Sequence, residues 1–374
     1  MKNYDVVIVG AGASGIGIAS MLKDFGVKKM VVLERYKVGA TFEKWPKEMR
    51  FITPSFTTNF WGHMDLNSVV SGTSPAYSLD TEHPTGKEYA KYLRLISRHL
   101  ELPINENADV ENVEYSENRF IVHIKGHKII KSRFLIWAAG EFQYPNSNLF
   151  SSSPLLLHTS QIESWEQIQG DQIYIIGGGE SGIDAAINLS RLGKKVVLLE
   201  GNKDWNSIRT TDPSVNLSPY TIDRLNEEML NERITFFDKS QVKDIKLEDD
   251  KYRIYVRGKK SYQYQSATPP IIATGFKSSL MMVKDFFDWD KTNSYVLLNE
   301  HDESIKTPGL FLVGPQVRHE NHILCFIYKF RQRFGVVCNA IGNELEMDIS
   351  CLKQYRKEGL YLDDLGDCGQ ECPC

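Results

Sequence analysis

The feature that most constrains the fold of this chain is a glycine-rich segment that occurs twice. Residues 8–16, Ile-Val-Gly-Ala-Gly-Ala-Ser-Gly-Ile, return 167 positions later as residues 175–183, Ile-Ile-Gly-Gly-Gly-Glu-Ser-Gly-Ile. Each copy follows a β-branched, strand-like run and continues as an Ala-, Ile- and Leu-rich helical pattern that stops at a glycine. A second apolar strand then ends on an acid in both copies. The pattern predicts two βαβ units, and therefore a duplicated α/β fold.

The glycine spacing in both copies is GxGxxG, which is typical of dinucleotide-binding folds. The first glycine makes the tight strand-to-helix turn, the second lets the backbone approach a pyrophosphate, and the third lets the helix pack close to the strand. The N-terminus of the following helix offers unpaired N–H groups and a partial positive charge to the phosphates. The motif glycines are Gly10, Gly12 and Gly15 in the first copy and Gly177, Gly179 and Gly182 in the second.

An acid follows each glycine motif at the distance expected for a ribose contact. Glu34 lies 24 residues after Gly10, and Glu200 lies 23 residues after Gly177. A carboxylate at this position accepts hydrogen bonds from the adenosine ribose hydroxyls. Glu200 would repel a 2′-phosphate and favours NADH, whereas the nearby Lys203 and Arg209 could receive one. The sequence therefore leaves NADPH or NADH open for the second nucleotide.

The order of the predicted elements places the second dinucleotide unit inside the first. Residues 85–100 read as an amphipathic helix, and residues 110–137 as a meander of short strands. The chain returns to the first unit through a strand at 309–314, followed by an apolar helix at about 323–341. We expect a Rossmann-like dinucleotide-binding domain at 1–167 plus 275–362, a second Rossmann-like dinucleotide-binding domain at 168–274, and a mobile cysteine-containing tail at 363–374.

Composition supports a globular protein that acts on small molecules. The 374 residues are 41% hydrophobic and 25% charged with a net charge of −4, so there is no broad positive field to attract nucleic acid. No apolar run approaches the ~20 residues of a membrane-spanning helix, and no signal peptide is evident, which favours a cytoplasmic protein. The six cysteines lie in the last fifth of the chain, so we expect reduced thiols.

Taken together, these motifs resemble the two-dinucleotide flavoproteins, and specifically the flavin-containing monooxygenase-like group that includes cation-efflux-associated flavoproteins. The resemblance covers nearly the whole chain. It rests on the paired glycine motifs, the turn at 39–42, the crossover segments 138–140 and 273–275, and the closing strand 309–314. It implies that the N-terminal motif binds FAD, that the inserted motif binds NADPH, and that the reduced flavin uses O₂ to oxygenate a small soft nucleophile.

The same resemblance assigns individual residues. Thr41, Phe42 and Trp45 are expected near the flavin ring, and Asn59 matches an asparagine at its reactive face, with a turn asparagine as the alternative. Asn59 is the single catalytic candidate, and no metal ligands are predicted. The residues expected to bind the two cofactors are Gly10, Gly12, Ala13, Ser14, Gly15, Glu34, Arg35, Thr41, Phe42, Trp45, Val110, Ala139, Gly140, Gly177, Gly179, Glu180, Ser181, Gly182, Glu200, Gly275, Gly314 and Gln316.

The sequence departs from the monooxygenase pattern at several positions. Ser152 and Pro154 stand where that group has an aromatic residue and a glycine before the histidine, so His158 is interpreted as structural. Gly314 is followed by proline where related flavoproteins have Gly-Asp, so that Gln316 would substitute for the acid. The main alternative is a reductase resembling the bacillithiol-disulfide reductases. Neither dinucleotide domain is expected to contain a cysteine, so a thiol relay would need Cys368, Cys372 and Cys374 of the tail.

Overall fold

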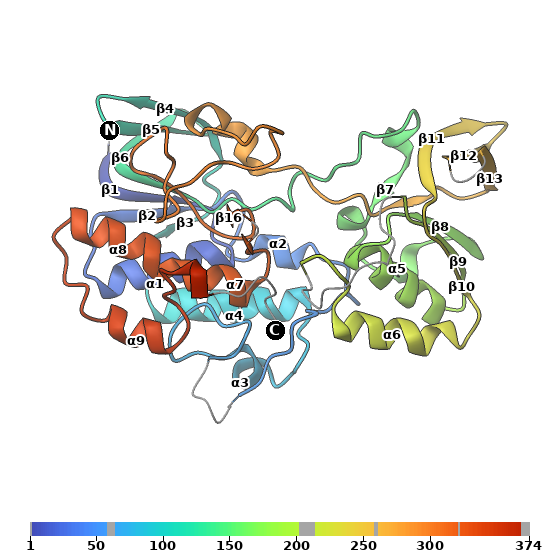
Figure 1. Cartoon of the computed structure of the whole chain (residues 1–374), viewed down its shortest axis with the longest axis horizontal. Coiled ribbons are helices and arrows are strands. Elements are labelled where there is room, and N and C mark those ends of the chain that lie inside the picture. The colour runs from blue at the N-terminus through green and yellow to red at the C-terminus, as the bar shows by residue number, and fades with distance from the viewer. Residues whose placement is uncertain (1, 58–63, 202–213, 258–260, 321, 368–374) are drawn as a thin grey trace. The chain divides into compact units, whose positions relative to one another are not determined.

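A computed structural model describes residues 2–57, 64–201, 214–257, 261–320 and 322–367. Within these ranges the chain forms two compact units (Figure 1). Unit 1 comprises residues 2–43, 54–141 and 278–367, and unit 2 comprises residues 44–53 and 142–277. The second unit is thus inserted into the first, which is the arrangement that the duplicated motif predicts.

Unit 1 is built on a seven-stranded sheet whose centre is parallel. Its strand order is β3-β2-β1-β6-β5-β4, and β15 pairs with β6 in addition. The ten-residue β6 pairs with β5 through its first half and with β15 through its second half. The bounds are β1 Lys2–Val9, β2 Met30–Leu33, β3 Ile104–Asn105, β4 Val110–Ser116, β5 Arg119–Ile124, β6 Lys128–Trp137 and β15 Leu310–Leu312.

Helices of unit 1 bury the central helix α1 (Ala13–Asp24). Every residue from Ala13 to Leu22 is buried, and α1 packs on α8 so closely that a Cβ at Gly17 would lie 2.2 Å from the Phe334 ring. Figure 1 shows α1, α4 and α8 on the same side of strands β1 and β2. The other helices are α2 Ala40–Glu43, α3 Pro75–Leu79, α4 Gly86–His99, α7 Ile327–Phe330, α8 Phe334–Glu344 and α9 Leu352–Lys357.

Unit 2 repeats the parallel arrangement on a smaller scale. Its five-stranded sheet has the order β10-β9-β8-β14-β7, and a separate three-stranded antiparallel sheet has the order β11-β12-β13. The bounds are β7 Leu157–His158, β8 Gln172–Ile176, α5 Glu180–Arg191, β9 Lys195–Leu199, α6 Pro219–Met229, β10 Ile234–Phe237, β11 Gln241–Glu248, β12 Lys251–Arg257, β13 Ser261–Ser266 and β14 Ile271–Ile272.

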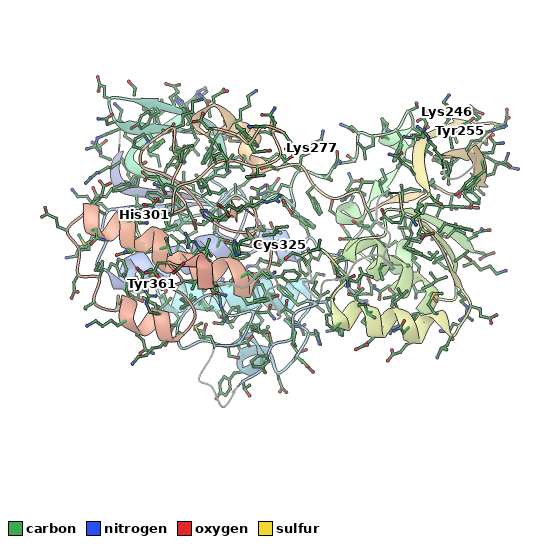
Figure 2. All side chains as sticks on the ribbon, viewed as in Figure 1. Lys246, Tyr255, Lys277, His301, Cys325 and Tyr361 are labelled. Atoms are coloured by element: carbon green, nitrogen blue, oxygen red, sulfur yellow. The ribbon has the colours of Figure 1, made fainter. Side chains whose placement is uncertain are left out.

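The parallel sheet of unit 2 has an apolar cluster on each face. Ile173 and Ile175 of β8 belong to the cluster that contains α5, whereas Tyr174 and Ile176 belong to the cluster with the antiparallel sheet. This alternation is what a strand with two buried faces requires. Lys246 and Tyr255, labelled in Figure 2, interact across β11 and β12, with the ammonium 5.5 Å from the ring centroid.

Short elements complete the chain. A two-stranded hairpin, β16 (Arg318–His319) with β17 (His322–Ile323), precedes α7. The 3-10 turns are η1 Ser153–Leu155, η2 Thr159–Gln161, η3 Trp165–Gln167, η4 Ser279–Met282, η5 Lys284–Phe286, η6 Arg331–Arg333 and η7 Leu365–Asp367.

The structure moves the predicted domain boundaries. Segment 142–167, expected in the first domain, belongs to unit 2 because β7 pairs with β14 in the second sheet. Residues 44–53 also belong to unit 2, where the Lys47 amide donates to the Glu163 carbonyl at 2.8 Å. The return to unit 1 falls at 278 rather than 275.

Two further expectations need correction. The predicted helix at about 323–341 starts later and is interrupted, because residues 322–323 form β17 and a 3-10 turn separates α7 from α8. The start of the predicted mobile tail is anchored, because Asp363 pairs with Arg356 at 2.7 Å, while residues 368–374 lie outside the described residues. None of the helices in the described ranges combines the length and apolar character that crossing a membrane requires.

Candidate functional site

The first glycine motif forms a tight turn between β1 and α1. Gly10 has φ +105°, and a Cβ there would lie 2.4 Å from the Ala138 carbonyl oxygen. A Cβ at Gly15 would lie 1.9 Å from the Gly10 carbonyl oxygen, so both positions exclude a side chain. Gly12 is different, since a Cβ there meets nothing within 4 Å. The second glycine is therefore not needed by the fold itself, and it faces open space where a ligand can approach.

The N-terminus of α1 presents unused hydrogen-bond donors. Gly12 is its N-cap residue and supplies no side-chain hydrogen bond. The amides of Gly12, Ala13 and Ser14 have no acceptor among the described residues. The peptide dipoles of the twelve-residue α1 are aligned along its axis and place a partial positive charge at its N-terminus. These amides therefore form a site that fits a phosphate anion.

Glu34, at the end of β2, is tied to the glycine turn. Its carboxylate accepts hydrogen bonds from the amides of Ala11 at 2.8 Å and Tyr36 at 2.9 Å. Burial raises the pKa of Glu34, and these two hydrogen bonds oppose the shift. Arg35 pairs with Asp109 at 2.6 Å, directly before Val110, which is buried at the start of β4. Glu34, Arg35 and Val110 thus lie on neighbouring segments of unit 1, and their contact with a ligand stays a prediction.

The segment after β6 packs on the glycine turn, and it brings Ala139 and Gly140 to the same edge of the sheet. A Cβ at Gly10 would lie 3.1 Å from the Ala139 Cα, and Gly140 has φ +63°. Gly314, with φ +103°, follows β15, and a Cβ there would lie 2.7 Å from the Ser14 hydroxyl of α1. Parallel strands end at a common edge, so the carboxyl ends of β1, β6 and β15 together surround the N-terminus of α1.

Gln316 belongs to a polar cluster that the sequence reading did not anticipate. Its amide donates to the Ser278 hydroxyl at 2.6 Å and accepts from Ser279 at 3.5 Å. Ser279 in turn accepts from the Trp137 indole at 3.0 Å. Burial raises the pKa of Glu141, and a hydrogen bond with Gln316 opposes this shift. No spacing rule links these positions, because they come from three separate parts of the chain.

The predicted flavin-side residues do not form one cluster within a single unit. Thr41 and Phe42 lie on α2 of unit 1, where the Phe42 ring meets Tyr89 edge-on at 4.8 Å. Trp45 belongs to unit 2, and its ring lies 5.0 Å from Phe51. Asn59, the catalytic candidate, lies outside the described residues. The assignment of these four residues to the flavin therefore stays a prediction.

The second glycine motif reproduces the backbone of the first. Gly177 has φ +108°, and a Cβ there would lie 2.3 Å from the Ala273 carbonyl oxygen. A Cβ at Gly182 would lie 1.9 Å from the Gly177 oxygen, while one at Gly179 meets nothing within 4 Å. The amides of Gly179, Glu180 and Ser181 have no acceptor among the described residues. Unit 2 therefore holds a second site of the same shape and donor set.

Glu200, predicted to contact a ribose, lies against the second glycine turn. Its carboxylate accepts the Gly178 amide at 2.6 Å, and the side chain is almost fully buried. The approach is close, because a Cβ at Gly178 would lie 3.0 Å from the Glu200 Cβ and 3.1 Å from its Oε2. A carboxylate is thus fixed beside the second glycine turn, whereas Lys203 and Arg209 lie outside the described residues.

Helix α5 carries a buried ionic network that sequence reasoning missed. Asp184 pairs with Arg224 of α6 at 2.9 Å, and burial raises the pKa of Asp184 to about 6. Burial also raises the pKa of Glu180, whose carboxylate accepts hydrogen bonds from the Ser218 amide and the Thr221 hydroxyl. The i, i+4 spacing of the two acids was a usable signal, since it places both on one side of α5.

His158 is a structural residue, as predicted. It is fully buried, and its Nε2 donates to the Gly275 carbonyl at 3.0 Å while Nδ1 accepts the Ser160 amide at 3.2 Å. Burial lowers its pKa. The bond fixes Gly275, whose φ of +75° corresponds to that of Gly140 in unit 1. The two glycines thus take the same left-handed backbone conformation after the corresponding strands of the two units.

The cysteine prediction is wrong for unit 1. Cys338 is buried in α8, and burial raises the pKa of its thiol. Cys325 and Cys351 also lie in unit 1, so this unit does contain cysteines. Cys368, Cys372 and Cys374 lie outside the described residues. No group of three or more His, Cys, Asp or Glu side chains in the described ranges is arranged to hold a metal ion.

Comparison with curated proteins confirms the resemblance to flavin-containing monooxygenase-like proteins. The chain is 26% identical over 192 residues to the uncharacterized oxidoreductase CzcO of Bacillus velezensis. That match covers 50% of this chain and 52% of the relative, so the chain spans about half the length of the curated relatives it matches first.

Comparison with solved structures confirms the two-domain FAD/NAD(P)-binding fold. The bacillithiol disulfide reductase Bdr of Staphylococcus aureus superposes with a TM-score of 0.74 at 17% identity, covering 92% of this chain and 99% of that one. A flavin-containing monooxygenase from Stenotrophomonas maltophilia gives a TM-score of 0.70 at 16% identity, covering 92% and 100%. The family model described as pyridine nucleotide-disulphide oxidoreductase matches residues 7–314. The chain therefore belongs to the pyridine nucleotide-disulphide oxidoreductase family.

Proposed function

We propose that this protein is an FAD- and NADH-dependent oxidoreductase of the flavin-containing monooxygenase type, which uses O₂ to oxygenate a small soft nucleophile. One observation carries the proposal. The chain holds two glycine turns of the same geometry, and each ends in three helix amides without an acceptor among the described residues. Two dinucleotides in one chain are useful chiefly when one reduces the other.

The residues of unit 1 fit FAD. The amides of Gly12, Ala13 and Ser14 would hold its pyrophosphate, and Glu34 would accept its ribose hydroxyls. When bound, FAD supplies a two-electron carrier between a reduced nicotinamide and an acceptor. The chain itself binds and orients the cofactor, and the polar cluster around Gln316 includes the partly buried Glu141 carboxyl at the same sheet edge.

The residues of unit 2 fit a nicotinamide dinucleotide, and Glu200 favours NADH. Its carboxylate is already fixed by the Gly178 amide, so it cannot swing away from a 2′-phosphate without losing a hydrogen bond in a buried position. The ribose 2′-hydroxyl of NADH can donate to the same carboxylate. NADPH would bring a dianion to that place and be repelled.

A second candidate function is the reduction of a low-molecular-weight disulfide. Two bacillithiol disulfide reductases superpose with TM-scores of 0.74 and 0.73, above the 0.70 of the monooxygenase. At 17% and 18% identity these superpositions support a shared fold. Disulfide reduction by this chain is therefore our second proposal. The three tail cysteines could contribute thiols to such an enzyme.

The test is a direct assay of the purified protein. We expect a yellow protein that oxidises NADH faster than NADPH and consumes O₂, with part of the O₂ recovered as oxygenated product when a small thioether or amine is added. Full recovery of O₂ as peroxide with every soft nucleophile, together with turnover of a low-molecular-weight disulfide, would replace the monooxygenase by the reductase. A colourless protein that does not take up FAD on reconstitution would overturn both.

A further inference from the structure

A buried carboxylate and a partly exposed histidine meet beside the predicted flavin site in unit 1. Asp302 lies in the loop before β15, and its carbonyl accepts the amide of Leu312, the last residue of β15, at 3.0 Å. His319 lies on β16, five residues after Gly314. Because β15 runs parallel to β6 and β6 to β1, both residues lie near the strand ends that surround α1. His301, labelled in Figure 2, is the neighbour of Asp302 in the chain.

The geometry fixes one nitrogen of the histidine. His319 Nε2 lies 2.5 Å from Asp302 Oδ1, where the side-chain exposures are 17% for His319 and 0% for Asp302. Asp302 is ion-paired with Arg333, whose Nη2 lies 2.9 Å from Oδ1 and whose Nε lies 3.0 Å from Oδ2. Because a paired carboxylate accepts hydrogen bonds, Nε2 of His319 is the donor. Nδ1 has no hydrogen-bond partner among the described residues.

Arg333 makes this pair rigid. Its guanidinium is 2% exposed and donates to the carbonyls of Glu300 at 2.6 Å and Leu362 at 2.8 Å besides Asp302. A buried carboxylate held on one side by a guanidinium and on the other by an imidazole fixes the ring orientation of that imidazole.

We propose that His319 donates the proton that the electron acceptor takes up, with Asp302 as its positioning residue. The inference rests on the proposed function and deepens it, and it holds for either acceptor. Oxygenation is NADH + H⁺ + O₂ + S → NAD⁺ + SO + H₂O, and disulfide reduction is NADH + H⁺ + RSSR → NAD⁺ + 2 RSH. Each consumes one solvent proton beyond the hydride that NADH supplies. Nδ1–H of the doubly protonated ring gives that proton to the acceptor, and solvent restores it through the exposed edge.

The test separates the two half-reactions. In His319→Gln, the side-chain amide can still donate to Asp302 but cannot transfer a proton. We expect anaerobic reduction of the bound flavin by NADH at the wild-type rate, and reoxidation by dioxygen or by hydroxyethyl disulfide slowed about 100-fold, the usual size of a lost general acid, with loss of the solvent isotope effect. His301→Gln changes a partly exposed neighbour and should match the wild type in both steps.

Each outcome is decisive. Reoxidation of His319→Gln at the wild-type rate with both acceptors overturns the inference, whereas failure of the wild-type protein to bind flavin or to be reduced by NADH overturns the proposed function instead. A readout without cofactor is the long-range ¹H–¹⁵N spectrum of the histidine-labelled, flavin-free protein. We expect the neutral His319 ring to be protonated at Nε2, with that signal absent in His319→Gln, and protonation at Nδ1 would contradict the geometry on which the inference rests.

Discussion

The two glycine turns share a backbone but differ in the side chains around them. Their first glycines have φ of +105° and +108°, and at both third glycines a Cβ would come within 1.9 Å of the first glycine's oxygen. Helix α1 has no acid in its first turn and is buried among apolar residues, whereas α5 starts with Glu180 and carries the buried pair Asp184–Arg224. The backbone requirement of a pyrophosphate is thus met twice by the same geometry, and the side chains are free to suit two different ligands.

The largest predicted effect comes from the second glycine of each turn. A Cβ at Gly12 or at Gly179 meets nothing within 4 Å, and both residues have ordinary negative φ, so alanine costs the fold little. It would, however, stand where the pyrophosphate approaches. We expect Gly12→Ala to fold and lose its flavin, and Gly179→Ala to keep its flavin but resist reduction by NADH.

The measurement is flavin absorbance per chain, circular dichroism, and anaerobic reduction by NADH for each variant. Gly10→Ala is the matched contrast, because its Cβ would meet the Ala138 oxygen at 2.4 Å and disturb the fold itself. If Gly12→Ala retains a full complement of flavin, the first turn does not hold the pyrophosphate.

The next effect concerns the acids that end β2 and β9. Glu200→Ser removes the charge opposed to a 2′-phosphate, and we expect kcat/KM for NADPH to rise relative to NADH by about ten- to hundredfold, which corresponds to about 1.4 to 2.8 kcal/mol. Glu34→Ser should weaken flavin retention and leave the ratio of the two coenzymes unchanged. An unchanged ratio in Glu200→Ser would mean that the charge at this position does not select the coenzyme.

A third, intermediate effect is the pH dependence that Asp184 gives to unit 2. Burial raises its pKa to about 6 from an ordinary 3.8, so its contribution to stability is fully present below about pH 4 and is lost as pH rises through 6. A shift of this size corresponds to a change on the order of 3 kcal/mol at most. The melting temperature of the wild type relative to Asp184→Asn should therefore fall between pH 4 and pH 6.

Asp290 in unit 1 should change the free energy of unfolding with pH in the opposite direction to Asp184. The Thr292 hydroxyl and nearby amides donate to its carboxylate and hold its pKa below the ordinary value. The stability that Asp290 contributes is present at neutral pH and is lost only in acid. Thermal unfolding from pH 3.5 to 7.5 compares these two pH dependences. It is measured for the wild type, Asp184→Asn and Asp290→Asn. If the melting temperatures of the wild type and Asp184→Asn change with pH in parallel, the raised pKa expected for the buried Asp184 carboxyl is contradicted.

The sequence predicted the elements that repeat a local rule. The glycine turns, the two acids and the helix at 85–100 follow from spacing within a short stretch of chain, and the structure has α4 at Gly86–His99 behind a Thr85–Glu88 capping box. What it missed depends on contacts between distant segments. The pairing of β7 with β14, which moves the domain boundary, joins residues more than a hundred positions apart.

The same distinction explains the polar sites. The cluster of Gln316 with Ser278 and the Asp302–His319 pair have no motif, because each member is an ordinary loop residue until the sheet brings it to the others. The helix predicted at about 323–341 was placed too early for a related reason. The apolar Ile323 and Leu324 satisfy a helical pattern, but residues 322–323 pair in a hairpin with β16.

The smallest predicted effect compares helices that begin with a side-chain cap. In unit 2 the Ser218 hydroxyl accepts the Thr221 amide at the start of α6, and in unit 1 the Thr85 hydroxyl accepts the Glu88 amide at the start of α4. Ser218→Ala and Thr85→Ala should each cost about 1 kcal/mol, because a cap is lost in both. Hydrogen exchange should rise in the first turn of the altered helix, with flavin content and NADH oxidation unchanged. A loss of either cofactor in these variants would show that the capped helices, and not only the uncapped α1 and α5, take part in binding.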